Sequence, residues 1–161
     1  MDHATQSADR PSLNRLAFSA TTHCLTGCSI GEVLGMVIGV ALGWENWATI
    51  ALSVVLAFMF GYLLTLLPLL RSGMALGVAF GLAFASDTLS ITIMEIVDNA
   101  VMVVIPGAMN AGLIDPLFWV SLLVSLILAG IAAFPANRWL IAHGRGHALV
   151  HAHHGHHPSH H

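Results

Sequence analysis

Residues 22 to 42 read THCLTGCSIGEVLGMVIGVAL, and this stretch decides the fold. It carries a single charged residue, Glu32, in a run long enough to cross a bilayer, because a hydrocarbon core about 30 Å thick needs about 20 apolar residues. Three further apolar runs follow, at residues 47–70, 74–109 and 117–141. The sequence therefore predicts an all-α integral membrane four-helix bundle, formed by residues 17–142.

The composition agrees with lipid as the solvent of this chain. Hydrophobic residues make up 57% of the sequence and charged residues only 8%, and the mean hydropathy is +0.81. These values exclude an ordinary soluble domain. There is no lysine and no basic patch, so we expect a lipid bilayer and no nucleic acid among the partners.

The third run, residues 74–109, is too long for one upright helix at 1.5 Å per residue. We expect this helix to be long or broken, with break points at Ser86-Asp87-Thr88 or at Pro106-Gly107. An alternative is that residues 86–99 form a polar connection outside the membrane. Asp115, followed by Pro116, is expected to cap the fourth helix.

Charge gives the orientation, because cytoplasmic loops of membrane proteins carry the excess of basic residues. The connections after the first and the third apolar runs contain no arginine and only the acids Glu45 and Asp115. We therefore expect a multi-pass protein of the inner (plasma) membrane with both termini cytoplasmic. All five arginines flank that one side: Arg10, Arg15, Arg71, Arg138 and Arg145.

The two ends of the chain differ from the apolar centre. Residues 1–16 are polar and are expected to form a flexible cytoplasmic lead-in. Residues 143–161 contain nine of the eleven histidines and are expected to form a cytoplasmic tail. Imidazoles at this density bind divalent metals weakly, although the same pattern also fits a solvated tail without a ligand.

Glycines recur at every fourth position in two of the runs, a spacing that lets helix backbones approach closely in lipid. We expect tight helix packing along both ridges, and a homo-oligomer that uses the surplus ridge. The ridges comprise Gly27, Gly31, Gly35, Gly39 and Gly43 in the first run and Gly73, Gly77 and Gly81 in the third.

Soft ligand side chains follow one line of the first helix. Cys24, Cys28, Glu32 and Met36 are spaced by four residues, which places them along one face, and His23 begins the run. Thiolate and thioether sulfur favour Cu(I) and related soft ions. The alternative is that Cys and Met are ordinary buried apolar residues.

The third helix presents a matching face that holds acids and methionines. Ionisable groups inside a bilayer are costly, so each one indicates a functional site. We expect this face to meet the sulfur line of the first helix, and Glu32, Glu95 and Asp98 to couple ion movement to protons. The expected metal ligands are His23, Cys24, Cys28, Glu32, Met36, Asp87, Met94, Glu95, Asp98 and Met102.

These residues predict a protein without enzymatic activity that binds or transports a soft metal ion, with copper as the expected ion. No nucleotide-binding glycine loop is present. One alternative is a membrane thiol-disulfide oxidoreductase that uses Cys24 and Cys28 with a quinone, although reactive pairs usually have two intervening residues. Another is an accessory structural subunit of a larger membrane complex.

Three strings resemble a small bacterial and archaeal membrane family that is catalogued as a domain of unknown function. They are HCLTGCSIGE at residues 23–32, DNAVM at 98–102 continuing to IPGAM at 105–109, and FP with NRWL at 134–140. The resemblance covers roughly residues 17–147. It implies a multi-helix membrane fold and no particular activity.

Overall fold

The computed structural model describes residues 12–143, which form helices joined by short connections and contain no strand. All four long helices are long and apolar enough to cross a membrane, so the chain is a multi-pass membrane protein. The expectations for residues 1–11 and 144–161 lie outside the described residues. The elements are α1 (Leu13–Leu42), α2 (Asn46–Arg71), α3 (Leu76–Val104), the short 3₁₀ helix η1 (Ala108–Asn110) and α4 (Pro116–Ala142).

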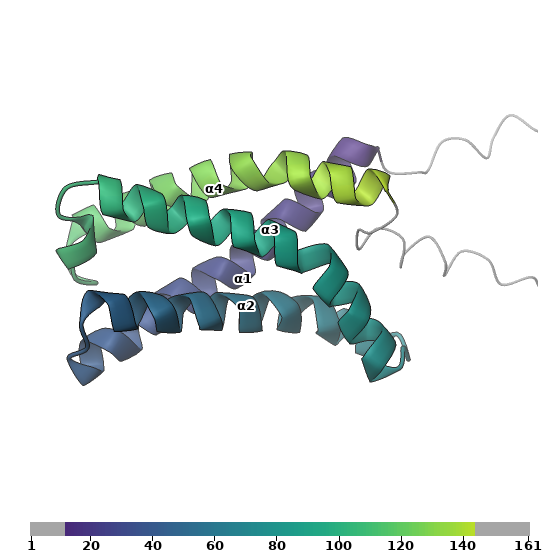
Figure 1. The fold of residues 1–161 in the computed structure, drawn as a ribbon, viewed down its shortest axis with the longest axis horizontal. Helices are drawn as coiled ribbons and strands as arrows, with labels where there is room; N and C mark the ends of the chain where they lie inside the picture. The colour runs from purple at the N-terminus through teal and green to yellow at the C-terminus, as the bar shows by residue number, and fades with distance from the viewer. Residues whose placement is uncertain (1–11, 144–161) are drawn as a thin grey trace, which may run out of the picture.

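The helices form an up-and-down bundle in which α1 packs most extensively on α2, and α3 on α4 (Figure 1). We call the end that holds the start of α1 and the α2–α3 turn the terminal end. The opposite end, which holds the α1–α2 turn and η1, is the turn end. Because α1 and α3 both run from the terminal end to the turn end, successive turns of α1 lie opposite successive turns of α3.

Helix α1 begins earlier than expected, at Leu13. Residues 13–16, predicted as part of the polar lead-in, form its first turn. The hydroxyl of Ser12 accepts a hydrogen bond from the backbone N–H of Arg15 at 3.3 Å, and such a cap allows a helix to start among polar residues.

Helix α3 is one continuous helix through Ser86, Asp87 and Thr88, so the alternative of a polar connection at residues 86–99 is wrong. The helix accommodates its threonines because their hydroxyl groups bond to the helix backbone. Thr88 donates a hydrogen bond to the carbonyl of Phe84, and Thr92 donates one to the carbonyl of Thr88, both at 2.6 Å. Such bonds commonly bend helices, and α3 curves along its N-terminal part (Figure 1). It ends before Gly107, whose φ of 84° requires glycine.

Four of the five glycines in the first predicted ridge pack against α2, which confirms the close helix packing expected there, whereas Gly43 ends α1 with a φ of 64°. A Cβ atom placed on Gly27 would lie 2.7 Å from the Cα of Gly61, and one on Gly31 would collide with the backbone of Ala57. Further along, Gly35 and Gly39 meet Ser53 and Thr49 in the same way. Glycine thus sets how closely these two helices approach.

The glycine ridge of α3 behaves differently from the prediction. No atom of the described residues lies within 4 Å of a Cβ placed on Gly77 or Gly81, and Gly73 serves the α2–α3 turn with a φ of 85°. This part of α3 diverges from α4 (Figure 1), so Gly77 and Gly81 meet no other helix among residues 12–143.

Candidate functional site

The interior of the bundle is lined by two facing rows of side chains. On α1, Cys24, Cys28 and Glu32 are buried, with Met36 half-buried at the end of the row. The α3 face is buried over its whole predicted length. Its members are Asp87, Ser90, Ile91, Met94, Glu95, Asp98 and Met102.

Three carboxyl groups meet between α1 and α3. Glu32 of α1 faces Asp98 and Glu95 of α3, and Asp98 also lies beside Ser125 of α4. The exposed fractions are 9% for Glu32, 5% for Glu95 and 4% for Asp98, so these groups are shielded from the surface. We call Glu32, Glu95 and Asp98 the acid cluster.

Several oxygens of the acid cluster have donor groups nearby but make no well-formed hydrogen bond. Within residues 12–143, both carboxyl oxygens of Glu32 and of Glu95, and one of Asp98, make no hydrogen bond of ordinary geometry. Arg15 lies roughly 25 Å along α1 from Glu32 at 1.5 Å per residue. The described arginines lie at the terminal end, so none of them neutralises the cluster. A charged carboxylate at the centre of a membrane helix costs roughly 2.5–3.5 kcal/mol, so a proton or a cation at the acid cluster would lower its free energy.

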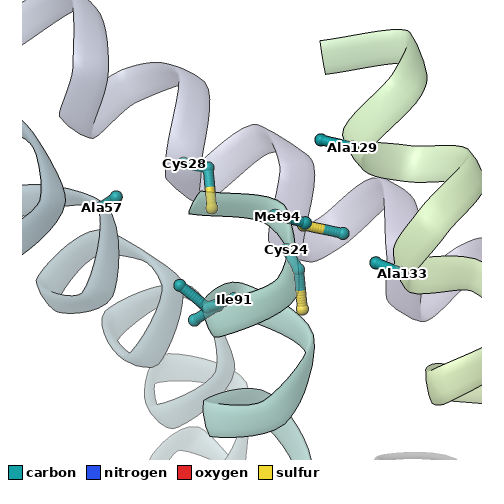
Figure 2. Close-up of a cluster of buried hydrophobic side chains, with 7 residues drawn as sticks. All are labelled: Cys24, Cys28, Ala57, Ile91, Met94, Ala129 and Ala133. Atoms are coloured by element: carbon teal, nitrogen blue, oxygen red, sulfur yellow. The ribbon is translucent and has the colours of Figure 1, made fainter. Parts of the chain in front are cut away.

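Cys28 and Cys24 precede Glu32 by about one and two turns of α1, and Figure 2 shows both thiols in a buried group with Met94 of α3. Cys24 and Cys28 are free and 1% exposed. They share a buried group with Met94 of α3, flanked by Ala57 of α2 and small residues of α4. Cys28 lies beside Glu95. A sulfur ligand is therefore adjacent to the acids.

A second polar level lies nearer the terminal end. Cys24 lies beside Ser90 and close to Asp87 of α3. Asp87 is fully buried, and its Oδ1 accepts a hydrogen bond from the hydroxyl of Ser86 at 2.8 Å. Asp87 thus belongs to the level of Cys24 and lies about 16 Å along α3 from Asp98.

A cavity of about 230 Å³ leads from the turn end to the acid cluster. Glu32 and Asp98 line its inner part, and the exposed residues Asn46 and Asn110 line its outer part. A hydrogen bond of 3.2 Å joins the side chains of Asn46 and Asn110 there. The volume accommodates several water molecules, each occupying about 30 Å³ in the liquid.

The structure brings most of the expected ligands together but not all of them. His23 is half-buried and projects about 100° around α1 from Cys24. It therefore does not lie in the α1 row. Among residues 12–143, no group of three or more His, Cys, Asp or Glu side chains is arranged to hold a metal ion. A metal would need methionine sulfur, hydroxyl groups or water to complete its ligand shell.

Several polar residues of the site were absent from the expected set. Ser121 and Ser125 of α4 are fully buried, and Ser125 reaches Asp98. The spacing of four residues between these two serines, on an otherwise apolar helix, is the sequence signal that could have identified them. Met109 of η1 lines the cavity with Met36 and Met102. Its position in a connection gave no periodicity from which to place it.

The fold and interior define a multi-pass membrane protein with a buried acid and thiol site at the inner end of a cavity. The chain belongs to the family described as Domain of unknown function (DUF4396), whose model matches residues 13–146. This agrees with the uncharacterised membrane family expected from the sequence. No curated protein and no solved structure matches the chain.

Proposed function

We propose that this protein binds a soft, Cu(I)-like metal ion between α1 and α3 and passes it through the membrane. The observation that carries the proposal is the acid cluster, in which several buried carboxyl oxygens make no hydrogen bond of ordinary geometry within the described residues and Glu95 lies beside the reduced thiol of Cys28. Carboxylates attract a cation, and thiol and thioether sulfur select a soft one. The described arginines, Arg15, Arg71 and Arg138, lie at the terminal end and do not supply a positive charge to the acid cluster.

The helix geometry favours metal binding over thiol-disulfide chemistry. Cys24 and Cys28 lie one turn apart in the continuous helix α1. Side chains at that spacing have Cβ atoms about 5–6 Å apart, whereas a disulfide needs about 3.5–4.5 Å. Oxidation within the chain would therefore require α1 to distort, while two reduced thiols remain available to a metal.

The proposal includes a location. We place the protein in the inner (plasma) membrane with both termini in the cytoplasm, because the described arginines lie at the terminal end. The cavity then opens on the outer side. Proton coupling through the acid cluster and a homo-oligomeric assembly remain part of this proposal.

The test is Cu(I) binding to the detergent-purified full-length protein, measured by competition with a chromogenic chelator. We expect the wild-type chain to bind Cu(I), and the variants Cys28→Ser and Glu32→Gln to weaken binding about tenfold or more. The matched control is Glu45→Gln, because Glu45 lies in the exposed α1–α2 turn.

A folding check accompanies each variant. Circular dichroism and gel filtration establish that the variants retain the helical bundle. Wild-type protein that binds no more Cu(I) than a membrane protein lacking cysteine would overturn the proposal. Rapid loss of both thiols on addition of a quinone would favour the oxidoreductase instead.

A further inference from the structure

The cavity at the turn end is lined by sulfur as well as by carboxylates. Met36 of α1, Met102 of α3 and Met109 of η1 reach it from three separate elements. They belong to one packed group, in which Met102 is buried and Met36 and Met109 are partly buried. We call Met36, Met102 and Met109 the methionine triad.

The other methionines show that this convergence is local. The chain has seven methionines. Met59 of α2 is 48% exposed on the outside of the bundle, and Met94 belongs to the thiol group. The methionine triad packs with apolar residues such as Phe118 and also lines the cavity that Glu32 and Asp98 line, so its thioethers lie in the wall of a partly polar cavity.

Glu32 provides an independent sign that this cavity takes a ligand. It lines the cavity, is 9% exposed, and has two oxygens without a hydrogen-bond partner within the described residues. Ser53 and Thr49 of α2 add hydroxyl oxygens to the wall. Thioethers, carboxylates and hydroxyls together suit a soft cation that keeps part of its water.

We infer that the methionine triad, together with Glu32 and Asp98, forms a loading site for a soft monovalent cation that arrives from the turn end. The inference rests on the proposed function and adds a second site and a direction of access. Neutral thioethers lie outermost, the acid cluster follows, and the thiols lie deepest. An ion can bind to the outer thioethers and then move inward to the acids and thiols, because the outer ligands hold it weakly enough to release it, as conduction requires.

The first test isolates the loading site by removing the thiols. Ag(I), a redox-stable soft cation, is titrated calorimetrically into the Cys24→Ser/Cys28→Ser protein, with imidazole in the buffer to mask binding by the histidine-rich segment. We expect Ag(I) binding to persist, and the additional changes Met36→Leu, Met102→Leu and Met109→Leu to weaken it about tenfold or more. Leucine keeps the side-chain volume and so preserves the packing.

The control is Met59→Leu in the same background, which we expect to leave Ag(I) binding unchanged. Equal binding with and without the methionine triad overturns the inference alone, as does loss of all binding when the thiols are removed. Absence of Ag(I) binding by the wild-type chain overturns the proposed function and, with it, the inference.

A second test concerns the direction of access. A single cysteine is placed at Asn110 in the thiol-free background and modified with a bulky methanethiosulfonate. We expect Ag(I) loading to slow about tenfold, because Asn110 lines the outer cavity. The matched control is Ile114→Cys, since Ile114 is 99% exposed in the same connection and does not line this cavity. Equal rates after modification at either position contradict access from the turn end.

Discussion

Gly31 lies where α1 and α2 approach most closely, and a single methyl group there would meet the backbone of Ala57. Backbone atoms cannot move aside as a flexible side chain can, so the two helices would have to separate. Because α1 also carries Cys28 and Glu32 on its inner face, such a separation would displace the site. Gly31 therefore controls where Cys28 and Glu32 lie relative to α2 and α3.

This argument gives a pair of matched substitutions. We expect Gly31→Ala to destabilise the bundle by about 1–3 kcal/mol through overpacking. Gly81→Ala should be neutral or stabilise α3 by about 0.5–1 kcal/mol, because no atom of the described residues lies within 4 Å of the added methyl. Thermal unfolding in detergent measures both changes, and equal effects would contradict the close contact of α1 and α2.

At the scale of the elements, the helices differ in how their ends are held. The side chain of Asp115 accepts a hydrogen bond from the backbone N–H of Leu117 at 2.9 Å, which caps α4. Glu45 occupies the equivalent position before α2 and makes no such bond. The prediction of a cap at Asp115 is confirmed. The cap also fixes where α4 begins beside the cavity.

We expect Asp115→Ala to cost about 1 kcal/mol of stability, the usual effect of losing a helix cap. Glu45→Ala is the matched control and should change stability by less than half as much. Urea or thermal unfolding in the same detergent compares the two. A larger loss for Glu45→Ala would show that the Asp115 cap does not hold the end of α4.

At the scale of the whole molecule, polarity is distributed unevenly between the two ends. The described arginines lie at the terminal end, whereas the cavity opens at the turn end beside Asn46 and Asn110. Among residues 12–143, the turn end therefore presents oxygen and sulfur and no arginine. If the proposed function holds, the direction of insertion determines which compartment supplies the ion.

We expect both termini to face the cytoplasm. The measurement is labelling of Glu45→Cys, in the thiol-free background, by a membrane-impermeant maleimide added to intact cells. Labelling should be strong at Glu45→Cys and absent at Ser72→Cys, which lies in the α2–α3 turn. The reverse pattern would mean that the bundle is inserted the other way round and that the cavity faces the cytoplasm.

Local physics made much of this protein predictable from its sequence. The four apolar runs determine the membrane spans, because spanning depends on hydrophobicity. The spacing of Cys24, Cys28 and Glu32, and the acids within the runs, determine the inner faces, because facing depends on helical geometry. The continuity of α3 through Ser86 to Asn99 was left open, because hydroxyl groups bond to their own helix in a way that composition does not reveal.

Only the tertiary structure decided which faces meet and which stay open. The parallel course of α1 and α3 places Glu32 against Asp98, while Ser125 approaches from a helix that read as almost wholly apolar. The two glycine ridges look alike in sequence, yet one packs on α2 and the other meets no helix in the part of the chain that the structure describes. The tertiary structure also brings Met109 of η1 beside the cavity that Met36 and Met102 line. Contacts between distant segments depend on how helices cross, and no single helix encodes that crossing in its own periodicity.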